Sequence, residues 1–464
     1  MKATNLWQSM RVVAVTLVVV LAALPAFAQN RSGTVRRGTA TTASGKKPNI
    51  ILCMTDDQGW GDTGYNGHPE LKTPNLDAMA AAGIRFDRFY AANPLCTPTR
   101  ASCLTGRSPV RYFCYSWGHD LPLREITLAE AARKAGYATA HFGKWHLGGI
   151  PNAKGGTGRG LPESFCPKPR HPGNQGFDNW FSAGNFYDIG YEHIYHNGKQ
   201  VPPREGDTAD VLMDEALKWI GRQAGSGKPF LALVWFPSPH DPWQAAPKYA
   251  EPYEKYGKEK ANYYGELAAV DHNMGRLREA LREMGVAENT MLWFNSDNGG
   301  YGNMTHSTGG LPGGKKWLTE GGTRVPGILE WPARVKKPFA TTIPAGTLDF
   351  YPTTLDVLGI KMPDEVGPID GVSLLPLIDG TMKRRPKPMP LVKDRHQLRV
   401  IDNDYILQNK KLWRFDEDKK EDVDVTEKHP GEHTRLTQWV ETWRQSVKKD
   451  NDAYKQWLNS ILGE

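Results

Sequence analysis

Four short apolar runs, none alternating between polar and apolar residues, constrain the fold of this chain more than any other feature. They occupy residues 50–54, 137–142, 230–236 and 291–294. Continuous apolar runs of this length are typical of strands whose two faces are both covered, as in a parallel sheet. Helical patterns lie between them, at residues 127–135, 207–222 and 262–284. Alternating strands and helices predict an α/β fold with right-handed crossovers.

A cluster of charged or amide side chains follows each of the four runs. The clusters are Asp56-Asp57, Lys144 with His146, His240-Asp241 and Asp297-Asn298. In such sheets the ligand binds beyond the carboxyl ends of the strands, so these side chains are expected to meet at one edge. Carboxylates gathered there would repel one another unless a cation lay between them, and oxygen ligands favour Ca²⁺ or Mg²⁺ over zinc. The alternative for the aspartates is an ordinary turn or a helix cap.

A cysteine, Cys96, precedes a predicted helix in the stretch NPLCTPTRASCLTGRSP. Pro98 is tolerated in the first helical turn, and the helix can continue to Gly106. Cys96 is therefore expected at or just before the helix N-terminus, where free backbone N–H groups and the helix dipole favour an anion. Arg100, roughly one turn further along, can reach back toward position 96. Three roles stay open for the thiol: a thiolate nucleophile, an inert residue, or the precursor of another group.

Five blocks of sequence occur in the order found in a known enzyme family. They cover residues 48–57, 95–107, 143–148, 296–299 and 315–326; the second contains C-T-P-T-R and the third is GKWHLG. Together they resemble the type I, formylglycine-dependent sulfatases of the alkaline phosphatase-like superfamily. The resemblance covers most of the chain. It implies an α/β fold with a large mixed, mostly parallel sheet sandwiched by helices, and a small C-terminal subdomain of antiparallel sheet plus helix.

The resemblance also implies a set of site residues. In that family the cysteine of C-x-P-x-R is oxidised to Cα-formylglycine, so a formylglycine-generating maturation enzyme is an expected partner of this chain. The implied ligands of one Ca²⁺ are Asp56, Asp57, Asp297, Asn298 and an oxygen of the modified Cys96. The other implied catalytic residues are Arg100, which holds the formylglycine, Lys144 and His146, which orient its hydroxyls or the bound sulfate, and His240 and Lys315, which face the substrate sulfate.

The implied mechanism explains why an aldehyde is made from the cysteine. Hydration gives a geminal diol; one hydroxyl, polarised by the metal, attacks sulfur and expels the alcohol. The second hydroxyl then releases sulfate and restores the aldehyde, a step that a serine or an unmodified thiol lacks. The two lysines and Arg100 supply fixed positive charge, and His240 is the candidate proton donor to the leaving oxygen. The alternatives are structural roles for both histidines and solvated surface positions for both lysines.

The first 28 residues have the composition of a secretory signal peptide. A basic start precedes an apolar run at residues 12–24 and a small-x-small site that ends at Ala28. The run is shorter than the ~20 apolar residues that span a bilayer, so a membrane anchor is the less favoured alternative. Residues 29–47 are expected to be a flexible lead-in. The mature protein is therefore predicted to be periplasmic or secreted, without a stable membrane anchor.

Charge and cysteine content exclude several classes of protein. The formal net charge of +7 is a modest indication of an anionic substrate, although solvated surface lysines explain it equally well. No basic run is interleaved with aromatic residues, so nucleic acid is not an expected partner. The five cysteines are Cys53, Cys96, Cys103, Cys114 and Cys166. They form no C-x-x-C pair, which excludes zinc-ribbon and thioredoxin-like sites, and their spacing predicts no disulfide pairing.

The pattern changes near the C-terminus. Residues 48–377 are predicted to form the catalytic domain and residues 378–464 a C-terminal subdomain. Strand candidates at residues 389–393, 398–401, 405–408 and 411–415 are spaced as antiparallel hairpins. A helix is expected over residues 432–449, with Trp439 and Trp443 on one face. Core packing is the expected role of these tryptophans, and a sugar platform is the alternative.

Taken together, the residues and the resemblance predict an exported sulfatase, a sulfuric ester hydrolase that acts on sulfated carbohydrates. Segments at residues 149–185 and 243–262 are rich in aromatic and basic residues and are expected to be loops that shape its pocket. A hexosamine 6-sulfate would suit such loops, but the sequence specifies no sugar or linkage. Two alternatives stay open: a phosphodiesterase or phosphonate monoester hydrolase on the same scaffold, and a non-catalytic binder of sulfated glycans.

Overall fold

The computed structural model describes residues 46–150, 170–185, 189–190, 193–361, 367–415 and 423–462. The predicted signal peptide, most of the predicted lead-in and Cys166 lie outside the described residues. Within the described part of the chain, no helix is both long and apolar enough to cross a membrane. The cysteines that the structure describes, Cys53, Cys96, Cys103 and Cys114, are all buried free thiols.

The largest sheet has ten strands in the order β12-β2-β11-β9-β1-β8-β4-β5-β6-β7. These strands are β1 (Asn49–Thr55), β2 (Ile84–Phe86), β4 (Ala138–Lys144), β5 (Asn179–Ala183), β6 (Ile194–His196), β7 (Lys199–Gln200), β8 (Phe230–Trp235), β9 (Thr290–Ser296), β11 (Gly327–Glu330) and β12 (Phe339–Thr341). The four predicted apolar runs form β1, β4, β8 and β9, which are adjacent and parallel. Because β11 and β6 run antiparallel to their neighbours, the sheet is mixed and mostly parallel, as predicted.

Helices cover both faces of this sheet. Successive residues of each central strand are therefore buried on opposite sides. In β1, Ile50 and Leu52 belong to one apolar cluster, whereas Ile51 and Cys53 belong to another. The first cluster includes residues of α2 (Cys96–Thr105), α3 (Leu128–Lys134) and α8 (Phe350–Leu358). The second includes residues of α1 (Pro74–Ala82), α4 (Thr208–Ser226) and α6 (Lys258–Glu283). Burial on both faces is the reason why the sequence of these strands does not alternate.

The three predicted helices between the strands are confirmed as α3, α4 and α6. α3 begins after Thr127, whose hydroxyl accepts a hydrogen bond from the backbone N–H of Glu130 at 3.2 Å, while the Glu130 carboxylate accepts one from the backbone N–H of Thr127 at 2.8 Å. This reciprocal pair is a capping box. The expectation of a loop at residues 243–262 is wrong. Most of that segment is helical, in α5 (Pro247–Ala250) and a 3₁₀ helix (Glu251–Tyr256), because the rings of its tyrosines pack against α6.

The described part of the chain also forms two smaller sheets. One has the order β10-β3-β13, formed by β3 (Phe89–Tyr90), β10 (Arg324–Val325) and β13 (Ala345–Gly346), with α7 (Glu320–Thr323) just before β10. The other is the predicted C-terminal antiparallel sheet of β14 (Met389–Val392), β15 (Leu398–Asp402), β16 (Tyr405–Gln408) and β17 (Lys411–Arg414), which follows α9 (Leu375–Ile378). Met389 and Ile401 of this sheet share an apolar cluster with Tyr90 and Leu348, so the C-terminal sheet packs directly on the elements before it. The domain boundary at residue 377 stays a prediction.

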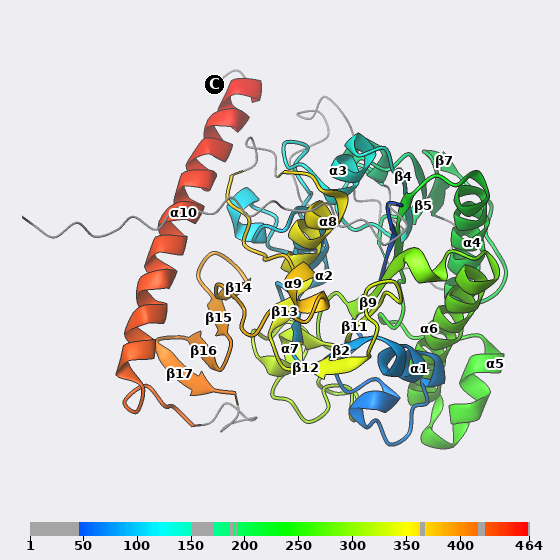
Figure 1. Ribbon diagram of the computed structural model, residues 1–464. Helices are drawn as coiled ribbons and strands as arrows, with labels where there is room; N and C mark the ends of the chain where they lie inside the picture. The colour runs from blue at the N-terminus through cyan, green and yellow to red at the C-terminus, as the bar shows by residue number, and fades with distance from the viewer. Residues whose placement is uncertain are drawn as a thin grey trace, which may run out of the picture. The chain divides into compact units, whose positions relative to one another are not determined.

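The last helix, α10 (Pro430–Leu462), is longer than the predicted 432–449 (Figure 1). The helix continues because residues beyond Lys449 make tertiary contacts that a local pattern cannot reveal. Asp450 accepts a hydrogen bond from Arg111 at 2.7 Å, and the ring of Tyr454 lies 5.3 Å from that of Phe113. The rings of Trp439 and Trp443 stack at 6.2 Å and contribute to apolar clusters with the C-terminal sheet, which confirms core packing as their role.

Candidate active site

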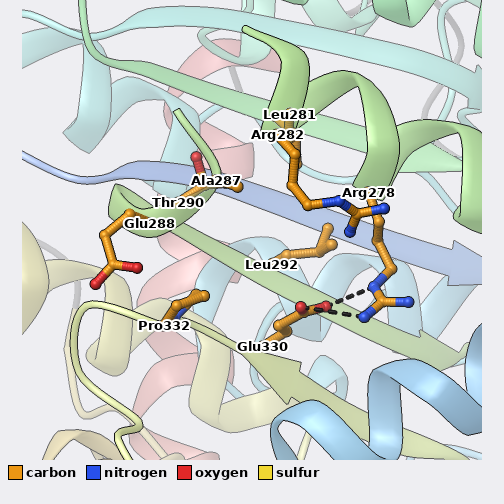
Figure 2. A pocket seen from close by; sticks show the side chains of 9 residues that line it. All are labelled: Arg278, Leu281, Arg282, Ala287, Glu288, Thr290, Leu292, Glu330 and Pro332. Carbon is orange, nitrogen blue, oxygen red and sulfur yellow. Dashed lines mark hydrogen bonds and ion pairs between the residues drawn. The ribbon is translucent and has the colours of Figure 1, made fainter. Parts of the chain in front are cut away.

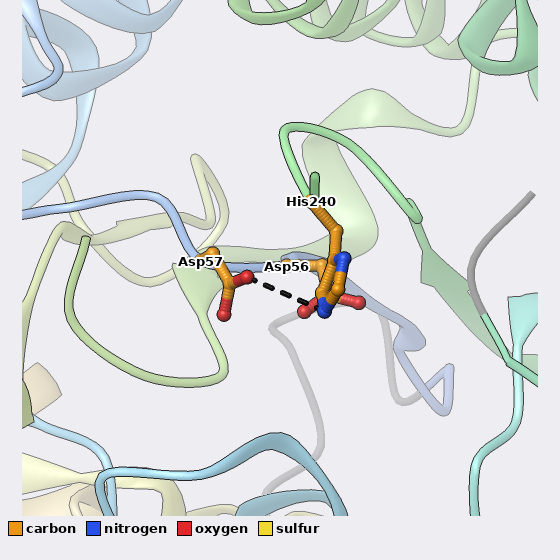
Figure 3. A group of neighbouring side chains, drawn as sticks. All are labelled: Asp56, Asp57 and His240. Carbon is orange, nitrogen blue, oxygen red and sulfur yellow. Dashed lines mark ion pairs between the residues drawn. The ribbon is translucent and has the colours of Figure 1, made fainter. Parts of the chain in front are cut away.

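The four polar clusters meet at the carboxyl ends of β1, β8, β4 and β9, as the parallel arrangement requires. Asp56 and Asp57 directly follow β1, and Asp297 directly follows β9. Ligand atoms of Asp56, Asp57 and His240 all lie within 4.8 Å of one another. Figure 3 shows these three side chains close together. Ligand atoms of Asp56, Asp297 and Cys96 meet the same limit. The structure thus brings both predicted aspartate clusters, one predicted histidine and the predicted cysteine to one point.

The carboxylates at this point are buried and crowded. The side chains of Asp56, Asp57, Asp297 and Asn298 are fully buried. Asn298 donates a hydrogen bond to Oδ1 of Asp57 at 2.7 Å, and Oδ1 of Asp297 accepts one from the backbone N–H of Asp57 at 3.2 Å. Asp57 has φ of 68°, a left-handed conformation that costs energy for a residue other than glycine. Such strain at a cluster of charges is typical of a functional site.

Two buried oxygens of this cluster suit a hard cation. Oδ1 of Asp56 and Oδ1 of Asn298 accept no hydrogen bond from any described residue. Burial, followed by the neighbouring charge of Asp56, raises the pKa of Asp297 to about 7, against the opposing effect of Arg100. A divalent cation between these oxygens would satisfy the open acceptors and relieve the repulsion. Three carboxylates and one amide oxygen are the ligand types that Ca²⁺ prefers, so the residues present fit the metal that the resemblance implies.

Arg100 and Lys144 supply buried positive charge next to these carboxylates. Nη2 of Arg100 lies 2.7 Å from Oδ2 of Asp297 and 3.4 Å from Oδ2 of Asp56. Its Nη1 donates a hydrogen bond to the backbone oxygen of Lys144 at 3.0 Å, and the Lys144 ammonium forms an ion pair with Asp56. Gly143 allows this arrangement: its φ is 104°, and a Cβ there would lie 1.9 Å from the backbone oxygen of Trp235. Lys144 can therefore enter the site only because glycine precedes it.

Cys96 is the first residue of α2, and only 1% of it is exposed. Its place at the helix N-terminus confirms the prediction, and the helix ends before Gly106, which adopts the left-handed C-cap conformation. Burial raises the pKa of the Cys96 thiol to about 11, although Lys144 acts in the opposite direction. Burial thus disfavours the thiolate form of the unmodified residue.

Lys315 and His240 form the other side of the site, around Asp57. Nζ of Lys315 lies 2.5 Å from Oδ2 of Asp57 and 3.1 Å from Nε2 of His240. Although burial alone would raise the pKa of Asp57, the charges of Lys315 and His240 hold it well below its usual range. Burial lowers the pKa of His240, against the opposing charge of Asp57. Both predicted residues thus lie where a substrate anion next to Asp57 would meet them.

His146 reaches the site from the segment after β4. Both of its ring nitrogens are buried and make no hydrogen bond to any described residue. Burial, followed by the charge of Lys144, holds the pKa of His146 well below its usual value. An imidazole with two open nitrogens in a polar site is available to a ligand.

Sequence analysis missed Tyr301. Its hydroxyl lies 2.6 Å from Oδ2 of Asp57 and accepts a hydrogen bond from Nζ of Lys315 at 3.4 Å. The hydroxyl also contacts the carboxylate of Asp241, next to His240. The signal that could have identified it was its position, directly after the Asp297-Asn298-Gly-Gly turn.

A separate pocket of about 200 Å³ lies at the opposite end of the sheet (Figure 2). Its lining includes Thr290, at the start of β9, whereas Asp297 follows the end of that strand. Arg278 and Glu330 form an ion pair in this pocket, with Nε and Oε2 2.7 Å apart. The pocket therefore does not belong to the site at the carboxyl ends of the strands.

Comparison with known proteins identifies the family. The family profile described as Sulfatase matches residues 48–360, which is more than half of the chain. The chain belongs to the sulfatase family. As a member of that family it is a sulfuric ester hydrolase, and the predicted fold class is confirmed with it.

Individual relatives of this sulfatase agree with the assignment. It is 33% identical over 385 residues to N-acetylgalactosamine-6-sulfatase of Sus scrofa, covering 75% of this chain and 69% of the relative. It is 31% identical over 351 residues to an ulvan-active sulfatase of Formosa agariphila, covering 72% of this chain and 65% of the relative. The crystal structure of Ps i-CgsB in complex with k-i-k-neocarrahexaose is similar, with a TM-score of 0.76, 26% identity, and coverage of 87% of this chain and 94% of that one.

Proposed function

We propose that this sulfatase hydrolyses sulfate esters of sulfated carbohydrates, with Cα-formylglycine made from Cys96 and one Ca²⁺. The observation that carries the proposal is the position of Cys96. It begins a buried helix, and its sulfur lies within 4.8 Å of carboxylate oxygens of both Asp56 and Asp297. A side chain there with an oxygen in place of sulfur would face the same cation as the carboxylates.

The metal would be held by Asp56, Asp57, Asp297 and Asn298, together with an oxygen of the modified residue 96. The open oxygens of Asp56 and Asn298 support this ligand set. A bound Ca²⁺ supplies positive charge that polarises the oxygens it binds. Arg100 fixes the geometry, because its guanidinium bridges Asp297, Asp56 and the backbone at Lys144.

Formylglycine supplies, as its hydrate, a hydroxyl nucleophile that an unmodified cysteine lacks. The chain's own residues bind and orient the ester around it. Lys144 and Lys315 place fixed positive charge near residue 96 and can bind the sulfate oxygens. His146 presents open ring nitrogens to the same group. His240 carries its ring next to Lys315 and is the proposed proton donor to the leaving alcohol oxygen.

Sulfated carbohydrates are the proposed substrate class because relatives bear names of that kind. One is named for N-acetylgalactosamine 6-sulfate and another for ulvan, and the similar crystal structure holds a neocarrahexaose. We also propose export from the cytoplasm, on the composition of residues 1–28, followed by loss of that segment. Fractionation of an expressing cell, with sequencing of the mature N-terminus, tests export.

The test of the function compares a matched pair of aryl esters. The full chain is produced in a host with the formylglycine-generating enzyme, and release of 4-nitrophenol is measured from 4-nitrophenyl sulfate and from 4-nitrophenyl phosphate. The proposal predicts a clear preference for the sulfate and no turnover by Cys96→Ala. A large preference for the phosphate would favour a phosphoester hydrolase instead. Tight binding of a sulfated sugar without any turnover would favour a non-catalytic binder.

A further inference from the structure

Two tryptophans are exposed in the described part of the chain, and both adjoin the site. Trp117 is 42% exposed and Trp317 is 64% exposed. The ring of Trp117 stands edge-on to that of His146, 6.1 Å away, and Trp317 follows Lys315 by two residues. Exposed indole rings are costly in water and are typical of binding surfaces. Trp117 thus adjoins His146, and Trp317 adjoins Lys315.

A turn of the C-terminal sheet places a cation against the aromatic residues on each side. This turn, residues 393–397, connects β14 to β15. The Lys393 ammonium lies 5.9 Å from the ring centre of Trp317. The Arg395 guanidinium lies 5.4 Å from the ring centre of Tyr115, two residues before Trp117. We call these five residues the rim: Tyr115, Trp117, Trp317, Lys393 and Arg395.

The rim is fixed to the segment that leads into α2. The backbone oxygen of Ala92 accepts a hydrogen bond from Val392 at 3.0 Å, and the Asn93 side chain donates one to the backbone oxygen of Lys393 at 3.2 Å. On the other side, the backbone N–H of Lys316 donates to the oxygen of Pro94 at 2.9 Å. Cys96 follows these residues directly. The rim is therefore attached to the same short, buried segment of backbone that leads to residue 96.

The turn itself is ordered by its one carboxylate. Oδ1 of Asp394 accepts hydrogen bonds from the backbone N–H groups of His396 at 2.8 Å and Gln397 at 2.9 Å. Its negative charge is thus engaged inside the turn. Lys393 and Arg395 carry their charges beside aromatic rings, and cation–π contacts at exposed sites are weak. Both cations keep N–H donors for an anion.

We propose that the rim binds further anionic sugar units of an oligosaccharide, beyond the unit whose sulfate is cleaved. This inference rests on the proposed function, since it extends the same site. Aromatic faces stack on sugar rings, and the two cations pair with sulfate or carboxylate groups at a distance from the reacting ester. The enzyme would then act on chains in preference to single sugars, and the C-terminal sheet would set that preference.

The test measures binding in the Cys96→Ala background, so that turnover does not interfere. Dissociation constants are determined by calorimetry for the disaccharide and the hexasaccharide of chondroitin 6-sulfate, ι-carrageenan and ulvan. We expect at least one hexasaccharide to bind about tenfold more tightly than its disaccharide. The double variant Lys393→Ala with Arg395→Ala should remove most of that difference, and Trp317→Ala should reduce it. The effect of the double variant should shrink at high salt, because exposed charges are screened.

The matched control is Lys383→Ala with Arg384→Ala, which also removes one lysine and one arginine charge, but from other exposed positions. Arg384 pairs with Asp404, in the turn at the other end of β15. An equal loss in this control, or no hexasaccharide that binds more tightly than its disaccharide, would overturn the inference. Turnover of 4-nitrophenyl sulfate by matured protein with intact Cys96 keeps the two proposals apart. If the protein turns over the ester but shows no preference for a hexasaccharide, only the proposed role of the rim is wrong. If it turns over no ester at all, the proposed function is wrong.

Discussion

The hydroxyl of Tyr301 lies 2.6 Å from Oδ2 of Asp57, the same oxygen that Nζ of Lys315 approaches at 2.5 Å. Oδ2 of Asp57 thus contacts both a neutral donor, the Tyr301 hydroxyl, and a cation, the Lys315 ammonium. Its other oxygen accepts a hydrogen bond from Asn298 at 2.7 Å. Asp57 is therefore fixed from three sides, which suits a ligand that must present one geometry to a metal.

Tyr301→Phe should weaken activity without unfolding the protein. Loss of one hydrogen bond worth about 1 kcal/mol should lower kcat/KM for an aryl sulfate by roughly fivefold to tenfold. Steady-state kinetics at saturating Ca²⁺ measure the effect, and thermal unfolding checks the fold. Tyr405→Phe, whose hydroxyl lies in the C-terminal sheet 3.4 Å from Nδ1 of His429, is the matched control. Unchanged kinetics for Tyr301→Phe would show that Asp57 does not depend on it.

Removal of Ca²⁺ should lower both activity and stability. Without a cation the buried Asp56 and Asp57 repel Asp297, whose pKa burial and these charges raise to about 7. At 100 times its dissociation constant a bound ligand adds about 2.7 kcal/mol of stability, so added Ca²⁺ should raise Tm measurably. Scanning calorimetry with chelator and with Ca²⁺ measures the shift. Asp297→Asn should abolish the increase in Tm on addition of Ca²⁺, whereas the control Asp404→Asn, at an exposed position, should retain it. If Ca²⁺ does not change the Tm of the parent protein, the proposed metal site is wrong.

Arg100→Lys should lower both stability and activity strongly, although it preserves the positive charge. The guanidinium makes separate contacts with Asp297 and with the backbone oxygen of Lys144, and an ammonium cannot reproduce both. Because the site is buried, we expect the free energy of unfolding to fall by about 2–4 kcal/mol and kcat to fall at least about a hundredfold. Urea unfolding measures the free energy of unfolding, and steady-state kinetics measure kcat. An active, fully stable variant would mean that Arg100 serves only as a charge.

Acid should weaken the attachment of α10. Arg111 makes two hydrogen bonds to Asp370, at 2.6 and 2.7 Å, and Trp443 of α10 donates to the same carboxylate at 2.7 Å. Burial alone would raise the pKa of Asp370, but Arg111 and these donors hold it below its usual value. A depressed pKa in the folded state stabilises the protein above the unfolded-state pKa of about 3.9, and this contribution is lost as pH falls through the folded-state pKa.

Asp370→Asn reports this contribution directly. The variant should be less stable than the parent by about 3 kcal/mol at pH 6, because it leaves Arg111 buried beside a neutral amide. The difference between the two proteins should narrow as pH falls below about 4. Urea unfolding from pH 6 to pH 3.5 measures it. A difference that stays constant over this range would show that the Asp370 charge contributes nothing.

The central sheet could be predicted because its strands are buried on both faces, which leaves uninterrupted apolar runs such as residues 50–54. The meeting of Asp56 with Asp297 followed from the same pattern, since parallel strands end at one edge. Strands of two or three residues, such as β2 and β10, carry too little pattern to be recognised from sequence.

Features that depend on distant contacts could not be predicted. The rim residues Lys393 and Arg395 have ordinary sequence surroundings, and only the fold brings them to the rings of Trp317 and Tyr115. The length of α10 depends on Asp450, whose partner Arg111 lies more than 300 positions earlier. Tertiary contacts of this kind override local signals for helix ends.

The most direct measurement is the mass of the peptide that contains residue 96, taken from full-length protein matured with the formylglycine-generating enzyme. We expect this residue to have lost its sulfur and to carry an aldehyde that reacts with a hydrazide probe, in proportion to the sulfatase activity of each preparation. An unmodified Cys96 in protein that still cleaves sulfate esters at full rate would contradict it.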